Sequence, residues 1–353
     1  GGSGSAGYGS GASSGGDQFI EKSPLQPTPV GAFRFNTDSS KLEYYDGNQW
    51  VSVTSDSPEA QTGGGRGLFG GGATPSDEVN TIDYINLTTT GNALNFGDLT
   101  YRTDFPAACA SRTRGFWVGG TNPGVAGLAG MDTVTISSTG DATDFNDDIP
   151  HRGGGGFSDQ TRGIFPSING GTNVIEYITM AATGTAVEFG DAYVAAASAA
   201  GLSSPTRGIM GGGDAPAYTN VIQYLTISTL GNTADFGDLS QVKGYPVGAS
   251  SATRGLFMTG FLSPASSNTN TIEYITIASL GNALDFGDAA VATRHAAGTS
   301  DCKRAVCTAG APGYAGSISY VQIATTGNAV DYGDQYESRR GMAGCSNAHG
   351  GLG

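Results

Sequence analysis

Charged residues are scarce in this chain, and long apolar runs are missing. Charged side chains make up 14% of the 353 residues, with 17 lysines and arginines against 31 aspartates and glutamates, which gives a net charge of −14. No stretch gathers the basic side chains that would neutralise a phosphate backbone, so nucleic acid is not expected as a partner. No apolar run approaches about 18 residues and no basic amphipathic helix is visible, so membrane insertion is not expected either.

Cysteine and catalytic motifs are equally sparse. The four cysteines lack the paired spacing of a zinc site and are too few to hold a fold of this size, so we expect buried free thiols. The three histidines are scattered, and no HExxH, GxSxG or P-loop string occurs. We therefore expect neither an enzyme nor a bound cofactor or metal. One acidic segment (Asp141, Asp144, Asp147 and Asp148) leaves calcium as a minor alternative, because its spacing lacks the ligand order of a known loop.

Glycine is abundant instead. Its 59 residues, together with many small polar ones, suit short strands and tight turns and predict an all-β protein. Residues 1–16, GGSGSAGYGSGASSGG, have almost nothing to bury, so segment 1–27 is interpreted as a Gly/Ser-rich arm or linker.

Segment 28–58 alternates apolar and polar side chains around two turn signals, which predicts a small three-stranded meander, with a generic β-hairpin as the alternative. The string GAFRFNTDSSKLEYYDGNQWVSV resembles a short module that recurs in phage tail-fibre and other virion structural proteins. The residues that carry the resemblance, in order, are Arg34, Phe35, Asn36, Thr37, Glu43, Tyr45, Asp46, Gly47 and Trp50. It implies a homo-oligomer on the virion surface, outside the cell, whose arm contacts other virion proteins.

Segment 59–353 is built from an internal repeat. A Phe-Gly-Asp element or its variant recurs six times, 44 to 50 residues apart, and an Arg-Gly element opens an apolar, Gly-ending strand in each repeat. Between the two elements runs a β-branched strand such as TIDYINL or VIEYITM, and a strand of small residues precedes the Arg-Gly element. Four strands per repeat is typical of a propeller blade.

These repeats predict a six-bladed β-propeller, with a seven-bladed ring or a β-solenoid as alternatives. The repeat begins at a second strand and ends with a first strand, so the C-terminal strand should complete the first blade and close the ring. The small-residue strands should lie innermost, where space is least. The Gly-rich second strand is similar to that of kelch-type propellers, although the kelch Trp is absent.

Six arginines and six aspartates repeat with the strands, and we assign them a structural role, because a catalytic centre does not recur in every blade. We expect each Asp to accept backbone N–H groups in a turn or to pair with an Arg of the adjacent blade. They are Arg66, Arg114, Arg162, Arg207, Arg254 and Arg304, and Asp98, Asp147, Asp191, Asp238, Asp288 and Asp334.

The two faces of such a disc differ. The connections between strands 1–2 and 3–4 are nearly identical in every repeat, whereas the 2–3 and inter-blade connections vary in length and side chains, as recognition loops do. Aromatic residues expected on the variable face, and so predicted to bind a ligand, are Tyr101, Phe105, Tyr218, Tyr245, Phe261 and Tyr314. The resulting hypothesis is a non-enzymatic fibre tip or decoration protein that attaches to host-surface glycan; a purely structural virion component or a secreted bacterial glycan-binding propeller are the alternatives.

Overall fold

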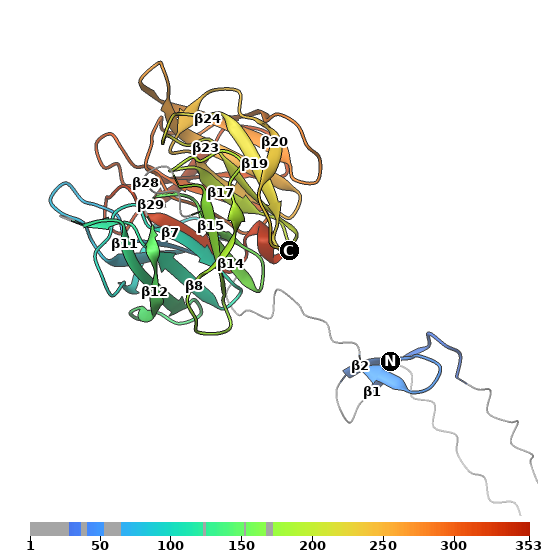
Figure 1. Cartoon of the computed structure of the whole chain (residues 1–353). Helices are drawn as coiled ribbons and strands as arrows, with labels where there is room; N and C mark the ends of the chain where they lie inside the picture. Colours follow the sequence, from blue (N-terminus) through green and yellow to red (C-terminus); the bar gives the residue numbers. More distant parts are fainter. Residues whose placement is uncertain (1–27, 37–40, 53–64, 123–124, 152, 167–171) are drawn as a thin grey trace, which may run out of the picture. The chain divides into compact units, whose positions relative to one another are not determined.

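The computed structural model describes residues 28–36, 41–52, 65–122, 125–151, 153–166 and 172–353 (Figure 1). The chain divides into two units, Gly1–Ala60 and Gln61–Gly353. The described residues form an all-β structure whose only helical element is a single 3₁₀ turn, η2 (Gly350–Leu352), and they contain no helix long and apolar enough to cross a membrane. The predicted arm, residues 1–27, lies outside the described part.

The first unit contains the predicted meander, with strands β1 (Phe33–Asn36), β2 (Lys41–Tyr45) and β3 (Trp50–Ser52) paired in that order. Several residues of the motif found in segment 28–58 contact one another on this sheet. The Arg34 guanidinium lies 4.2 Å from the centre of the Trp50 ring and its Nε donates to Glu43 Oε2 at 2.8 Å. Asn36 Nδ2 donates to the other oxygen of Glu43 at 3.0 Å. Four of the nine motif residues, Arg34, Asn36, Glu43 and Trp50, therefore form one cluster.

The second unit contains six antiparallel sheets, numbered here as sheets 1 to 6 and each built on four strands (Figure 1). Strands are given from first to fourth in each sheet. Sheet 1 contains β30 (Ala343–Ser346), β4 (Arg66–Gly70), β5 (Thr81–Asn86) and β6 (Leu94–Asp98), and sheet 2 contains β7 (Ala107–Ala110), β8 (Arg114–Val118), β11 (Leu128–Thr135) and β12 (Thr143–His151).

Sheet 3 contains β13 (Phe157–Ser158), β14 (Arg162–Pro166), β15 (Val174–Thr179) and β16 (Val187–Asp191), and sheet 4 contains β17 (Ala200–Ser203), β18 (Arg207–Gly211), β19 (Val221–Thr226) and β20 (Ala234–Asp238). Sheet 5 contains β22 (Val247–Ser250), β23 (Arg254–Leu262), β24 (Ser267–Thr276) and β25 (Leu284–Asp288), and sheet 6 contains β26 (Gly298–Ser300), β27 (Arg304–Thr308), β28 (Ser317–Gln322) and β29 (Val330–Asp334). Two short strands, β9 (Thr121–Asn122) and β10 (Val125–Ala126), form a separate hairpin, and β21 (Lys243–Gly244) pairs with β23.

The last strand of the chain belongs to the first sheet, as the repeat register predicts. β30 pairs antiparallel with β4, and Ala343 lies opposite Gly70 while Ser346 lies opposite Gly67. The first strands of consecutive sheets also contact one another, from β7 through β13, β17, β22 and β26 to β30, and β30 contacts β7. The two ends of the repeat are thus held together by hydrogen bonds and by packing.

Small residues allow these first strands to approach one another closely. A Cβ atom added to Gly156 would lie 2.5 Å from the carbonyl oxygen of Ala108 in the neighbouring sheet. An added Cβ atom would lie closer still to backbone atoms of the preceding sheet at Gly201, Gly248 and Gly344. We call this level, formed by Ala108, Gly156, Gly201, Gly248, Gly298 and Gly344, the waist.

Below the waist, a series of serine hydroxyls links one first strand to the next. Each hydroxyl donates to a carbonyl oxygen of the preceding sheet, and each such bond stabilises the fold by about 1 kcal/mol. The pairs are Ser158 to Ala110 (2.8 Å), Ser203 to Ser158 (2.8 Å), Ser250 to Ser203 (2.7 Å), Ser300 to Ser250 (2.8 Å) and Ser346 to Ser300 (2.6 Å).

The C-terminal residues cover this end of the first strands. His349 Nε2 lies 2.8 Å from the carbonyl oxygen of Ala110, and His349 Nδ1 accepts the N–H of Gly351 at 3.1 Å. Since Nδ1 accepts, the imidazole proton is on Nε2, which donates to Ala110. Burial lowers the pKa of His349 to about 4, so the ring is neutral near pH 7.

The repeated arginines join neighbouring sheets, but through a partner that differs from the expected one. Each Nη1 donates to the carbonyl oxygen that directly follows the third strand of the next sheet, and each guanidinium lies over an aromatic ring of its own sheet. The pairs are Arg66 to Ile136 (2.8 Å), Arg114 to Met180 (3.1 Å), Arg162 to Ile227 (2.8 Å), Arg207 to Ile277 (2.8 Å), Arg254 to Ile323 (2.8 Å) and Arg304 to Leu87 (3.1 Å). The last pair connects sheet 6 to sheet 1.

The expected pairing of these arginines with the repeated aspartates is therefore wrong for the described residues. Five of the six aspartates act through their main chain: the N–H of each of these donates to a side-chain oxygen in the turn of the next sheet. The pairs are Asp98 to Asp141 (3.1 Å), Asp191 to Asn232 (3.0 Å), Asp238 to Asn282 (3.0 Å), Asp288 to Asn328 (3.0 Å) and Asp334 to Asn92 (3.0 Å). The side chain of Asp147 lies outside the described part.

Buried charges fix two of the connections between sheets. Lys243 Nζ lies 2.5 Å from Glu273 Oε2, and Arg339 Nη2 lies 2.9 Å from Asp83 Oδ1, with all four side chains at most 1% exposed. Glu273 and Asp83 occupy the same position in the third strands of their sheets. Glu273 thereby holds the segment around Lys243, which leads into β22 of the same sheet, and Asp83 holds the segment around Arg339, which leads into β30 of the same sheet.

Candidate functional site

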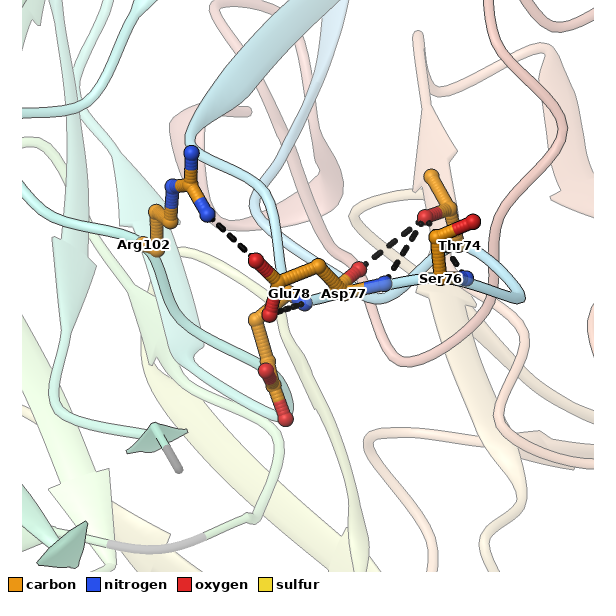
Figure 2. A network of polar contacts seen from close by, with 5 residues as sticks. All are labelled: Thr74, Ser76, Asp77, Glu78 and Arg102. Atoms are coloured by element: carbon orange, nitrogen blue, oxygen red, sulfur yellow. Dashed lines mark hydrogen bonds and ion pairs between the residues drawn. The ribbon is translucent and has the colours of Figure 1, made fainter. Parts of the chain in front are cut away.

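Hydrogen bonds show which connections share a face. Arg102 lies in the connection between β6 and β7, and Asp77 lies in the loop between β4 and β5. The distance from Arg102 Nη1 to Asp77 Oδ2 is 2.5 Å (Figure 2). Within that loop, Thr74 Oγ1 accepts the N–H groups of Ser76 and Asp77 and fixes its shape (Figure 2). Here a 2–3 connection and an inter-sheet connection meet, as expected, and we call this side the variable face.

A pocket of about 110 Å³, open to solvent, extends upward from the waist. We call it the central pocket, because segments leading into the first strands of all six sheets line it. The lining residues are 105–106, 108, 153–156, 198–201, 245–248, 295–298 and 341–344.

Six equivalent residues of the lining have a left-handed backbone. Each stands three residues before its waist residue and nine positions before the repeat arginine or its equivalent. Only glycine adopts this conformation freely, and another residue pays about 1–2 kcal/mol. Two of the six are glycines and four are not: the residues are Phe105 (φ 58°), Gly153 (59°), Ser198 (55°), Tyr245 (56°), His295 (56°) and Gly341 (70°).

Three of these side chains meet across the pocket. The His295 ring centre lies 4.4 Å from that of Tyr245 and 4.7 Å from that of Phe105, with interplanar angles of 79° and 84°. Phe105 and Tyr245 lie 6.5 Å apart. The three rings come from the entries to sheets 2, 5 and 6, and each pair in this edge-to-face geometry contributes about 0.5–1.5 kcal/mol.

Arg340 fixes the protonation of His295. Its Nη1 lies 3.2 Å from His295 Nδ1. A guanidinium only donates, so Nδ1 accepts and the imidazole proton is on Nε2. Burial, with the charges of Arg340 and Arg294, lowers the pKa of His295 to about 3, so the ring is neutral near pH 7.

The structure divides the six predicted ligand-binding aromatics among three places. Phe105 and Tyr245 meet at the central pocket. Tyr314 is linked to them through Arg340, whose guanidinium lies 5.6 Å from the Tyr314 ring centre and 5.9 Å from that of Phe105. Tyr218 and Phe261 form a separate pair at 6.1 Å. Tyr101 stands apart, since its hydroxyl donates to the Gly130 carbonyl at 2.7 Å and holds β11 in place.

Arg294 extends the site toward the second aromatic pair. Its guanidinium lies 4.7 Å from the ring centre of Phe261, and its Nη1 donates to Asn268 Oδ1 at 3.1 Å. Arg294 directly precedes His295 in the chain, and its charge helps to lower the pKa of that ring, so Arg294 connects this pair to the central pocket.

Sequence reasoning missed His295, Arg340, Arg294 and Ser198. His295 belongs to no motif. Arg340 is one of two adjacent arginines in a segment that was interpreted only as a first strand of small residues. A usable signal existed, because Phe105, Ser198, Tyr245 and His295 each stand nine positions before a repeat arginine. Aligning the repeats by those arginines brings the four residues into one column.

The described residues contain no group of three or more side chains suited to holding a metal ion. Of the acidic segment considered for calcium, Asp141 is engaged by the N–H of Asp98, and the side chains of Asp147 and Asp148 lie outside the described part. No protein-family model matches the chain, and no curated protein matches it.

Proposed function

We propose that the six sheets are the blades of a six-bladed β-propeller closed by β30, and that this propeller is a binding scaffold without catalytic activity. Its ligand is held at the mouth of the central pocket. The observation that carries the proposal is the use of Phe105, Ser198, Tyr245 and His295 in a left-handed backbone, where glycine serves at the two remaining positions. Strain of this kind concentrates at functional sites.

The energetic argument runs against a purely structural role for these rings. Each bulky residue raises the energy of the folded chain by about 1–2 kcal/mol, and the three rings remain only partly buried, so hydrophobic burial offsets this cost incompletely. Rigid aromatic side chains at an open pocket offer contact area that is already ordered before a ligand arrives.

We further propose that the chain works on a virion surface, as a fibre tip or decoration protein, with host-surface glycan as the ligand. The support is the motif resemblance of residues 31–53 and the aromatic character of the pocket mouth. On the first unit, Phe33, Phe35, Leu42 and Tyr44 alternate on one face of β1 and β2 and are 37–67% exposed. Such an apolar sheet face favours assembly, and we assign it to contact between copies of the chain.

Binding of the labelled chain to a glycan array and to candidate host cells tests the ligand-binding proposal. Tyr245→Gly and Phe105→Gly relieve the backbone strain, so each variant should stay folded while binding falls at least tenfold. Tyr193→Ala is the matched control, because this aromatic residue also lies between two sheets but is 62% exposed and outside the pocket lining. Loss of binding in the Tyr193 variant alone, or retained binding in both glycine variants, would refute the assignment.

The structural alternative makes a different prediction. If the chain only stabilises a particle, the glycine variants should assemble and protect the particle as well as the unaltered chain does. Replacement of Phe33 and Phe35 by serine should then abolish incorporation into particles. Loss of glycan or cell binding in the pocket variants, with assembly intact, would favour the adhesion proposal.

A further inference from the structure

The mouth of the central pocket carries positive charge on a chain whose net charge is −14. Two guanidinium groups lie near it, those of Arg340 and Arg294, and both charges contribute to lowering the pKa of His295 in the pocket lining. Arg340 lies 5.9 Å from the ring centre of Phe105 and 5.6 Å from that of Tyr314. Both arginines are partly exposed, so their charges face a site that solvent and a ligand can reach.

These two arginines are neutralised far less than the buried cations of the same unit. Lys243 and Arg339 each have a carboxylate oxygen within 2.9 Å. The carboxylate oxygen nearest Arg340 among the described residues is Asp104 Oδ2 at 3.8 Å, beyond hydrogen-bond distance, and the described residues place no carboxylate within 4 Å of Arg294. A guanidinium has five N–H donors, and the hydrogen bonds found here use one of each group.

Neutral His295 adds a directed donor to this charge. Its Nδ1 accepts from Arg340, which leaves the Nε2 proton for another partner, and the described residues supply none to it. The site therefore combines aromatic faces, two guanidinium groups and one imidazole N–H. Aromatic faces suit the C–H face of a sugar ring, and guanidinium forks suit a carboxylate.

We infer that the central pocket binds an acidic saccharide, whose ring packs on Tyr245 and Phe105 and whose carboxylate pairs with Arg340. This inference rests on the proposed function and narrows it to one class of ligand. Arg294 and Phe261 continue the same combination of charge and aromatic surface outward, so a second acidic residue of the saccharide would pair there. The acidic remainder of the chain repels polyanions, which confines such a ligand to this site.

Calorimetric titration with a glucuronate-containing oligosaccharide and with its uncharged glucose counterpart tests the inference. The acidic probe should bind at least tenfold more tightly at low salt, and the preference should shrink as the salt concentration rises. Arg340→Gln should reduce the affinity for the acidic probe at least tenfold and should remove the difference in affinity between the two probes. Arg102→Gln is the control, because Arg102 lies on the same face but is paired with Asp77 (Figure 2).

Each remaining outcome separates the inference from the proposed function. If both probes bind equally and Arg340→Gln changes neither, the acidic preference is wrong, while loss of binding in Tyr245→Gly still supports the pocket as the ligand site. If acetate competes as well as the acidic oligosaccharide does, the site holds an anion only and the saccharide assignment is wrong. If neither oligosaccharide binds, the inference fails, and the array and cell measurements with Tyr245→Gly decide the proposed function separately.

Discussion

Replacing Gly156 by alanine should strain the waist severely. The new Cβ atom would lie 2.5 Å from the carbonyl oxygen of Ala108 and 3.0 Å from its carbonyl carbon. The closest ordinary C···O contacts are about 3.3 Å, so the two first strands must separate by roughly 0.8 Å. Ala108 cannot move alone, because it is held in β7 opposite Trp117 of β8. Overpacking against a rigid neighbour costs about 1–3 kcal/mol, and we expect a value near 3 kcal/mol here.

The assay is urea-induced unfolding followed by far-ultraviolet circular dichroism. Gly184→Ala is the matched control, because a Cβ atom at Gly184 meets nothing within 4 Å and its φ is not in the left-handed region. That variant should stay within about 0.5 kcal/mol of the unaltered chain. If Gly156→Ala proves as stable as Gly184→Ala, the first strands are not packed backbone against backbone, and the reasoning about the waist is wrong.

Three further changes test other contacts. Arg304→Met removes a charge-assisted hydrogen bond to the Leu87 carbonyl and a cation–π contact with Tyr320, so the free energy of unfolding should fall by about 2 kcal/mol in urea titration; no change would mean that this link between sheets 6 and 1 is not formed. Lys243→Met leaves Glu273 buried without its cation and should cost about 3–5 kcal/mol, whereas adding Glu273→Leu should restore most of the loss; an additive double variant would contradict the ion pair. The pKa of His349 is lowered to about 4, so its contribution to stability is complete above the unfolded value of about 6.5 and is lost as the pH falls between about 6.5 and 4. After allowance for partial exposure this loss is about 2 kcal/mol, and His349→Asn should reduce the change in stability over that range by the same amount. The remaining slope includes His295, whose pKa is lowered to about 3, and an unchanged slope in the His349 variant would assign the pH dependence to other groups.

The repeat spacing was sufficient to predict the four repeated strands of each sheet, their order and the pairing of β30 with β4, but not the short strands β9, β10 and β21. Those features depend on local alternation and on a register that a single sequence displays. The partner of each repeat arginine could not be predicted, because a carbonyl oxygen carries no side-chain signature and lies in the next sheet. The buried pair of Lys243 and Glu273 was missed for a similar reason, since its members look like ordinary surface charges.

Some residues of the candidate site were among those selected from the sequence. The sequence assigned Phe105, Tyr245 and Tyr314 to one face, but which loops meet there depends on how the sheets are arranged around the waist. His295 and Arg340 gain their roles only from that arrangement, because Arg340 fixes the imidazole proton from another connection. Tyr101 is the opposite case, because the contact found for this aromatic loop residue, its hydrogen bond to the Gly130 carbonyl, is structural.

Native-state hydrogen exchange of the β30 and β4 amides tests most directly whether the last strand closes the first sheet within one molecule. If it does, amides of residues 66–70 and 343–346 that are bonded across this pair should exchange as slowly as those shared by β18 and β19, at every protein concentration. Fast exchange in both strands, or protection that appears only as the protein concentration rises, would show an open edge or a strand exchanged between copies, and would contradict the account.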